Sequence, residues 1–529
     1  MLSRRSVIGG MTGALASAGF VRSAQAQDAG AAQQAPAPAE GFSFDALTAR
    51  MRDAATRGYE PPAFDIPEPI RGLDYEGYKQ VAFRPDHAVW GDTDLPFRLQ
   101  AFHTGWLFNE PVRLFVVDDG AVQELTFSGA DFEYRPPLDP ADFEGLPFPG
   151  VAGFRLHFPL NRPDVFDEVI AFQGASYFRA VGYGNVYGIS ARGLAVNTAT
   201  GREEEFPRFT EFYIEKPHPD SRSLMIYATL ESRSLTGAYA FRVTPGIDTV
   251  TDVTARLFFR ADVERLGVAP MTSMFLFGEN NRAVFDDYRE RVHDSEGLRI
   301  VRRNGDELWR HLSNPHVLAN SFFVEDQPVS FALNQRHHAF EDYQDAEAHY
   351  ERRPSLRVET GEGWGKGHIQ LVEIPADADH MDNVVAFWTP EARVTAGSEL
   401  ALGYRLVWGT PGSEDSSLAR AIATRTGVGG PSGVRNDDGL RKFVIDYQGG
   451  MLRGLGPDAA VSPITHIGGG EVKTSSLHRL ADGTWRYAFD VAPAGDGPVE
   501  LAVRLDMAGR RLTETWLYQW RPGDEQRRF

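Results

Sequence analysis

Cysteine is absent from this chain of 529 residues. The absence excludes a disulfide framework, a thiolate metal site and a cysteine nucleophile. Long runs of lysine and arginine are missing too, and the formal net charge is −19. Nucleic acids and anionic membranes attract clustered positive charge, so neither is an expected partner, whereas a neutral substrate suits this composition.

A long hydrophobic run is also missing. The stretch from Val7 to Val21 is rich in small residues and shorter than the roughly 20 apolar residues that cross a bilayer. It follows the pair Arg4-Arg5, typical of twin-arginine export, and precedes a small-residue cleavage site that ends at Ala26. Residues 1–26 are therefore predicted to be a twin-arginine signal peptide, which implies a periplasmic protein. A flexible Ala/Pro/Gln spacer is predicted over 27–41.

The mature chain begins with one predicted amphipathic helix. Ser43 is a suitable N-cap for it, and Gly58 is placed to cap its C-terminal end. Apolar residues at helical spacing would form its buried face: Phe44, Leu47, Met51 and Ala54.

Beyond this helix the hydrophobic period changes to two, which is typical of β-strands. Alternating patterns occupy 239–243, 253–257 and 400–408, and Asp119-Gly120 lies where a hairpin turn is expected. The 53 glycines, 33 prolines and 12% aromatic residues also suit a turn-rich all-β protein. We predict a large β-sandwich over 42–408, a linker over 409–417 and a smaller all-β domain of immunoglobulin-like size over 418–529.

Several familiar motifs nearly match and then fail. The glycines of 182–188 lack the spacing and βαβ context of a dinucleotide loop, and Ser190 lacks the second glycine of a nucleophile elbow. Gly365-Lys366 is not followed by Ser or Thr, so it is no phosphate loop. His337-His338 has no further ligand at a standard metal spacing and is interpreted as a solvated pair. No cofactor and no metal are expected.

Carboxylates and aromatic rings are dense between 292 and 388. Glycosidic cleavage needs a carboxylic acid and a carboxylate, and aromatic rings stack on sugars. Acidic and aromatic residues are also common on the loops of β-sandwiches, so this density alone does not establish a glycosidase.

A set of longer strings is more specific, because they occur in order along almost the whole mature chain. These strings are 174–179, 186–195, 205–209, 267–275 and 364–367. They resemble the periplasmic (osmoregulated) glucan biosynthesis G/D family, in register from about Phe42 to Gln519. The twin-arginine signal and the segment 423–427 are closer to the protein D type.

The resemblance implies a galactose-mutarotase-like β-sandwich joined to an immunoglobulin-like domain, and activity on β-1,2-glucan. Family members resemble inverting endo-β-1,2-glucanases, with the acid at Asp382 and the base at Asp294. The alternatives are an inverting transglycosylase that closes a cyclic glucan through an α-1,6 linkage, or a non-catalytic glucan-binding assembly factor. Both aspartates could instead cap loop turns, because Asp commonly does so.

The same resemblance places other residues along the sugar groove and suggests partners. The implied substrate-binding residues are Tyr350, Arg353 and Glu373, with Trp364 and Trp309 balanced between sugar contact and core packing. Besides the β-1,2-glucan, a membrane glucan synthase is an expected partner, and a homodimer would fit similar proteins.

Overall fold

The computed structural model describes residues 41–410, 417–431 and 439–524. The predicted signal peptide (1–26), nearly all of the spacer (27–41) and most of the linker (409–417) lie outside these residues. Strand β25 (Glu399–Gly409) extends to the first position of that linker. The proposed domain boundaries stay predictions.

Helix α1 forms where its periodicity predicts. It spans Phe44–Ala54, and the Ser43 side chain accepts a hydrogen bond from the Ala46 backbone N–H. It ends at Ala54, before Gly58, with Ala55 in the cap position. Leu47 and Met51 are buried against the outer face of the larger sheet. Two short helices follow, α2 (Glu68–Arg71) and α3 (Tyr75–Tyr78).

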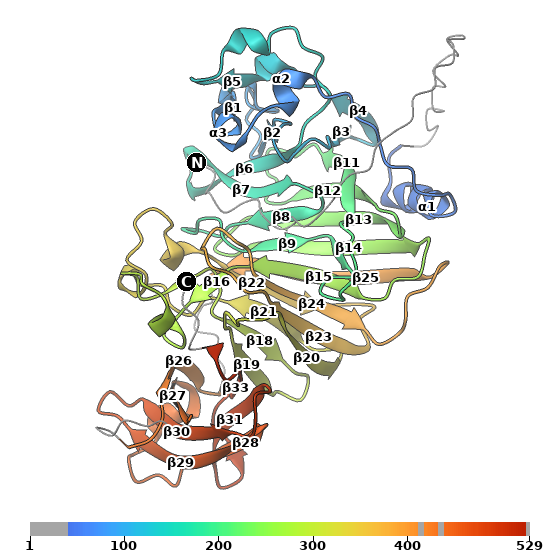
Figure 1. Ribbon diagram of the computed structural model, residues 1–529. Coiled ribbons are helices and arrows are strands. Elements are labelled where there is room, and N and C mark those ends of the chain that lie inside the picture. Colours follow the sequence, from blue (N-terminus) through green and yellow to red (C-terminus); the bar gives the residue numbers. More distant parts are fainter. Residues whose placement is uncertain (1–40, 411–416, 432–438, 525–529) are drawn as a thin grey trace, which may run out of the picture.

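The all-β prediction is confirmed, because two large sheets dominate the described chain (Figure 1). In spatial order, the ten-stranded sheet comprises β2 (Arg98–Phe102), β6 (Gly153–Arg162), β7 (Val165–Gln173), β8 (Tyr177–Ala180), β9 (Ser190–Arg192), β15 (Leu266–Ser273), β24 (Val384–Pro390), β23 (Lys366–Glu373) and β20 (Ala319–Asp326), with β10 (Leu194–Val196) beside β15. Its neighbouring strands pair antiparallel, and β20 forms one edge.

The second large sheet has fifteen strands. In spatial order these are β28 (Ser462–Gly468), β31 (Val499–Met507), β33 (Thr515–Trp520), β19 (Glu307–His311), β18 (Gly297–Val301), β21 (Ser330–Asn334), β22 (Ser355–Thr360), β25, β14 (Thr249–Phe259), β13 (Leu235–Thr244), β12 (Leu224–Glu231), β11 (Arg208–Glu215), β3 (Arg113–Asp118) and β4 (Ala121–Leu125), with β32 (Arg510–Arg511) beside β31. The β3–β4 hairpin turns at Asp119 and Gly120, both with positive φ, as the sequence predicts.

The main core lies between the two large sheets. The alternating residues Tyr239, Phe241 and Val243 are at most 1% exposed, and all belong to this core. The Phe241 ring contacts the Phe172 ring of the opposite sheet edge-on, with 5.4 Å between their centroids. The apolar residues that recur with a period of two are therefore those that face the opposite sheet.

Short sheets complete the fold at its periphery. One pairs β1 (Val81–Phe83) with β5 (Phe132–Tyr134), and another pairs β16 (Phe275–Phe277) with β17 (Val292–His293). The last is a four-stranded sheet of β26 (Arg420–Val428), β27 (Arg441–Gln448), β30 (Trp485–Pro493) and β29 (Gly470–Arg479).

The C-terminal strands form a smaller sandwich at one end of the molecule, orange and red in Figure 1. Its core lies between the four-stranded sheet and strands β31 and β33. These strands are not separate from the main body, because β33 pairs in parallel with β19, placing Trp516 opposite Trp309. The small sandwich therefore shares a continuous sheet with the large one.

A buried ion pair joins the two parts where the sheets meet. Arg336 Nη1 and Nη2 donate to the Glu514 carboxylate at 2.6 and 2.9 Å, and Glu514 is fully buried. Glu514 also accepts from the Ala421 backbone N–H at 2.8 Å, and the Arg336 guanidinium lies 3.4 Å from the centroid of the Trp309 ring. Four segments are thus tied to one charge pair.

We predict that Arg336→Ala lowers the free energy of unfolding by about 3–5 kcal/mol, because it leaves the buried Glu514 carboxylate without its counter-ion. Urea unfolding followed by tryptophan fluorescence measures the effect. Arg303→Ala, which removes an exposed arginine bonded to the Gln327 carbonyl, is the control and should change stability by less than about 0.5 kcal/mol. Equal stability of the two variants would contradict the prediction.

Candidate active site

Asp294 lies at the end of β17 and is 2% exposed. Its backbone N–H donates to the Met274 carbonyl at 2.8 Å, which fixes the position of the residue. The Arg353 guanidinium contacts both carboxylate oxygens, at 2.9 Å to Oδ1 and 3.0 Å to Oδ2. Arg353 thus supplies the counter-charge and hydrogen bond that a carboxylate removed from water needs.

Arg353 is itself held in one orientation. It is 2% exposed, its Nη2 donates to the Ala348 carbonyl at 3.0 Å, and its Cζ lies 4.9 Å from the centroid of the Tyr350 ring. Its aliphatic part packs on Gly188, where an added Cβ would lie only 3.1 Å from Arg353 Cβ. Glycine at 188 therefore leaves the space that the arginine occupies.

Asp382 lies in the loop between β23 and β24 and is half-buried. The next residue, Asn383, fixes this loop: its Oδ1 accepts from the Phe275 N–H at 2.8 Å, and its Nδ2 donates to the Phe275 carbonyl at 2.9 Å. The Asn383 N–H donates to the Ser273 carbonyl at 3.1 Å. The side chain of Asn383 thereby anchors the backbone beside Asp382.

These bonds bring Asp294 and Asp382 to opposite sides of the segment 273–275. The two aspartates are 88 positions apart in the sequence, yet each is next to the same short stretch of backbone. Neighbouring strands lie about 4.8 Å apart, so two backbones separated by one strand are on the order of 10 Å apart. The fold therefore places the two predicted carboxylates in a single region.

A further arginine on the ten-stranded sheet lies close to this region. Burial raises the pKa of Tyr177, the charge of Arg192 opposes that rise, and the charges of Glu204 and Asp382 add to it. The Arg192 guanidinium lies between the Tyr177 and Phe206 rings, with its Cζ 5.1 and 5.0 Å from their centroids. Our sequence analysis did not single out Arg192, although it lies within the string 186–195.

Three carboxylates surround Arg289, and one of them, that of Asp379, also contacts the Tyr350 hydroxyl. Arg289 contacts Asp287 at 2.6 Å, Asp345 at 2.8 Å and Asp379 at 3.2 Å. Hydrogen bonding to Asp287 is the largest influence and raises the pKa of Arg289. The Tyr350 hydroxyl donates to Asp379 at 3.2 Å. Tyr350 is fully buried, so it contributes this hydroxyl to the site and offers no exposed ring face.

Glu373 is buried rather than placed on a groove wall. It is 1% exposed, and Arg310 Nη2 donates to its Oε2 at 2.8 Å. The Ser313 N–H and hydroxyl donate to Oε1 at 2.7 and 3.2 Å. All of these bonds lie within the protein. Glu373 is thus paired with Arg310, whereas the sequence predicted direct contact with the sugar.

The two tryptophans lie in hydrophobic cores. Trp364 is 3% exposed in the main core and donates from Nε1 to the Gly403 carbonyl at 2.9 Å. Trp309 is fully buried in the core of the C-terminal sandwich. A sugar ring stacks on an exposed aromatic face, which neither side chain offers. This arrangement corresponds to the core-packing alternative for both residues.

His337 and His338 are both half-buried, so the pair is only partly solvated. His337 Nδ1 lies 2.9 Å from Glu296 Oε2, and His338 contacts the Glu351 and Gln335 carbonyls. Burial opposes protonation of His337, yet the charge of Glu296 raises its pKa. Among the residues described here, no group of three His, Asp or Glu side chains is arranged to hold a metal ion.

Comparison with known proteins identifies the family. The family model described as "Periplasmic glucan biosynthesis protein, MdoG" matches residues 42–520. The chain belongs to the periplasmic glucan biosynthesis family. "Glucans biosynthesis protein G" of Cereibacter sphaeroides is 55% identical, covering 92% of this chain and 93% of the relative. "Glucans biosynthesis protein D 1" of Ralstonia nicotianae is 43% identical, covering 93% and 94%.

Relatives of this chain are thus named both protein G and protein D, and the assignment of this chain to the protein D type stays a prediction. A solved galactose mutarotase related enzyme from Lactobacillus acidophilus is 9% identical, with a TM-score of 0.21, covering 50% of this chain and 93% of that one. The described part of the chain has no helix that is both long and apolar enough to span a membrane.

Histidines with lowered pKa values make stability depend on pH, and one of them, His293, directly precedes Asp294. Burial lowers the pKa of His293 to about 3 and that of His103 and His157 to about 4. In the unfolded chain each would titrate near pH 6.5. Between these values the unfolded state binds more protons, so stability is full above pH 6.5 and decreases as the pH falls.

We predict that the free energy of unfolding decreases by about 1.4 kcal/mol per pH unit for each such histidine as the pH falls from about 6 to about 4.5. Urea unfolding at a series of pH values measures the slope. His103→Gln should flatten it, whereas His478→Gln, which replaces an exposed histidine on β29, should leave it unchanged. A slope that is the same in both variants would refute the assignment of His103 as a buried neutral residue.

Proposed function

We propose that this family member is an anomer-inverting endo-β-1,2-glucanase that uses Asp382 as general acid and Asp294 as general base. The observation that supports this most directly is the position of the two aspartate backbones on either side of the segment 273–275, fixed by hydrogen bonds to Met274, Ser273 and Phe275. Two carboxyl groups flanking the scissile bond are what glycoside hydrolysis requires.

Inverting and retaining enzymes differ in the separation of their two carboxyl groups. Inverting enzymes hold their carboxyl groups roughly 6.5–9.5 Å apart to leave room for a water, whereas retaining enzymes hold them at about 5–5.5 Å. Two backbones separated by one strand leave room for the larger separation. In the proposed step, a water attacks the anomeric carbon and loses a proton toward Asp294. The bond to the leaving oxygen breaks as Asp382 protonates that oxygen.

The surroundings of the two residues suit different roles. Arg353 pairs with Asp294 and holds the proposed base in one position. Because Asp294 is only 2% exposed, its proton would arrive through a water or a substrate hydroxyl. Asp382 is half-buried and would meet the leaving oxygen directly or through a substrate hydroxyl. Arg192 offers hydrogen-bond donors to sugar hydroxyls, and the carboxylates around Arg289 offer acceptors.

The biological setting is part of the proposal. The Arg4-Arg5 pair supports export by the twin-arginine route, and the family description supports a periplasmic location. There the enzyme would trim β-1,2-glucan that a membrane synthase produces, and it would act as a homodimer. The net charge of −19 is compatible with a neutral glucan as substrate.

We predict that Asp382→Asn lowers the rate of cleavage of linear β-1,2-glucan by roughly 10²–10⁴-fold, because the amide cannot protonate the leaving oxygen. Mass analysis of the products over time measures the rate. Asp377→Asn changes an exposed aspartate of the same loop and should retain activity. Asp294→Asn should be as inactive as Asp382→Asn. Full activity of either active-site variant would reject the assigned pair.

The same products separate the three functions. Shorter linear oligosaccharides formed by the parent protein support the glucanase. Products lighter by one water than the matching linear glucan identify the transglycosylase, in which a sugar hydroxyl replaces the attacking water. A well-folded protein that binds glucan without turnover would reject both catalytic functions and favour the assembly factor.

A further inference from the structure

Three loops meet at Arg289, whose guanidinium contacts one aspartate from each of them: Asp287, Asp345 and Asp379. Followed along the chain, each loop leads to a residue of the proposed catalytic machinery: Asp294, Arg353 and Asp382, respectively. The Arg289 guanidinium therefore joins the segments that carry the proposed base, its arginine and the proposed acid.

The guanidinium divides its donors among the three loops. Its Nε and Nη2 donate to Asp287, at 3.0 Å to Oδ1 and 2.6 Å to Oδ2. Its Nη1 donates to Asp345 at 2.8 Å and to Asp379 at 3.2 Å. The Arg289 side chain is only 15% exposed, so water screens these charges in part. Several donors in one rigid plane are what arginine offers and lysine does not.

Three carboxylates around a single cation repel one another. Burial raises the pKa of Asp287 and Asp345, but hydrogen bonds from Arg289 and from nearby backbone N–H groups outweigh this effect and lower both pKa values. Both side chains are therefore ionised at neutral pH. If Arg289 were replaced by an uncharged residue, this repulsion would act on the segment with the weakest other anchors.

The base side of the site has anchors that do not involve Arg289. Asp345 accepts hydrogen bonds from the backbone N–H groups of Glu347 and Ala348, at 3.0 and 2.7 Å. The Ala348 carbonyl in turn accepts from the Arg353 guanidinium, which pairs with Asp294. These bonds should keep the proposed base and its arginine in place when Arg289 is replaced.

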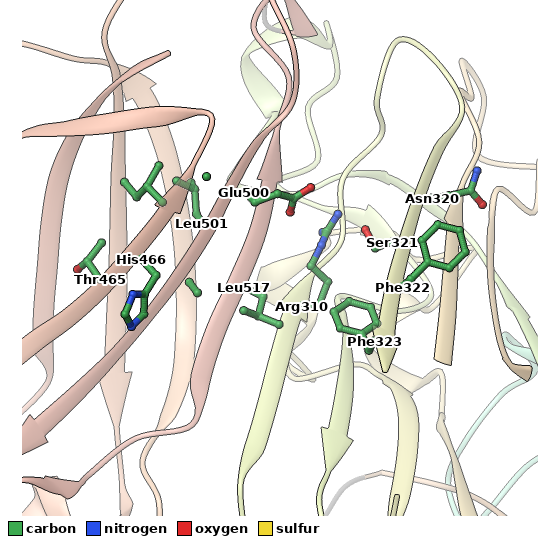
Figure 2. Close-up of a pocket in the computed structure, with 13 residues that line it drawn as sticks. Arg310, Asn320, Ser321, Phe322, Phe323, Thr465, His466, Glu500, Leu501 and Leu517 are labelled. Carbon is green, nitrogen blue, oxygen red and sulfur yellow. The ribbon is translucent and has the colours of Figure 1, made fainter. Parts of the chain in front are cut away.

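The loop 374–383, which carries Asp382, is anchored to the sheets at its two ends. At its start, Glu373 pairs with Arg310 of β19. Figure 2 shows the Arg310 side chain on this part of the sheet, where it also lines a groove. At the other end, the side chain of Asn383 bonds to the backbone of a neighbouring segment. The middle of the loop depends on further contacts to take one position.

Asp379 supplies such contacts in the middle of this loop. The Arg289 Nη1 and the Tyr350 hydroxyl both donate to its Oδ2, each at 3.2 Å. The Asp379 side chain is 34% exposed and lies three residues before Asp382. Movement of Asp379 away from the other two carboxylates would therefore displace the proposed acid.

We propose that Arg289 is a positioning residue that holds the loop of the proposed acid, Asp382, in its working position, an inference that rests on the proposed function. Arg289 acts through Asp379, which fixes the backbone that leads to Asp382. The base is held by other contacts. Arg289 thus supports protonation of the leaving oxygen and leaves the attack of water on the anomeric carbon unaffected.

The leaving group of the substrate tests this role. A sugar leaves only with a proton from the acid, whereas dinitrophenolate leaves as the anion and takes up no proton. Arg289→Met should lower kcat for linear β-1,2-glucan by roughly 10²-fold, as a misplaced catalytic group does. For a dinitrophenyl glycoside of a β-1,2-gluco-oligosaccharide, kcat should fall by less than about threefold. Retained activity on this second substrate also shows that the variant is folded.

Two further variants separate the charge of Arg289 from its contact with the loop. Arg289→Lys keeps one positive charge among the carboxylates and should recover roughly tenfold of the lost rate on glucan. Asp379→Asn weakens the contact from the other side and should show the same dependence on the leaving group. Added to Arg289→Met, it should cause little further loss, because both changes break one contact. If Arg289→Met does not fold, the behaviour of Asp379→Asn alone decides.

The matched control is Arg113→Met. Arg113 on β3 also lies between carboxylates, those of Glu124 and Glu211, so its removal leaves a similar excess of negative charge. It belongs to the fifteen-stranded sheet, next to the edge strand β4. This variant should cleave both substrates at the rates of the parent protein.

Two outcomes would overturn the positioning role of Arg289: an unchanged rate on glucan, or an equal loss of rate on both substrates in a folded variant. Failure of the proposed function gives a different result. Asp382→Asn would then cleave glucan at the parent rate, or would lose both rates equally. A parent protein that cleaves neither substrate would reject the proposed function and the role of Arg289 together.

Discussion

The structure depends on burying carboxylates beside arginines. Asp294, Glu373 and Glu514 are each at most 2% exposed, and each is neutralised by one arginine: Arg353, Arg310 and Arg336. An ionised carboxylate removed from water is tolerated only with a counter-charge and further hydrogen bonds. Each pair therefore fixes two segments far apart in the sequence, and together they help to position Asp294, the end of β23 and the C-terminal sandwich.

The site arises from backbone arrangements that these pairs stabilise. Segment 273–275 continues from a strand of the ten-stranded sheet, and both aspartates are placed against it by backbone and Asn383 hydrogen bonds. Neither carboxylate needs to contact the other to be correctly placed. The spacing of their two backbones follows from strand spacing, which varies little between proteins.

The fold was predictable from local patterns, and much of the site was not. Alternation identified the buried face at 239–243, and Ser43 marked the start of α1. Both signals are carried by residues that are neighbours in the sequence. The family resemblance supplied Asp294 and Asp382. Nothing local indicates that Trp309 and Trp364 lie in cores, or that Arg192 lies between two rings, because burial depends on strands distant in the sequence. Pairing of β33 with β19 was missed for the same reason.

The position of β33 has a consequence for how the chain reaches its native state. Along the chain β33 comes long after β19, yet it lies in the sheet between β31 and β19. A pairing between strands so distant in the sequence forms only after the later strand has been synthesised. The large sandwich therefore keeps an open strand edge at β19 on the ribosome, and protection of that edge during synthesis becomes a requirement for productive folding.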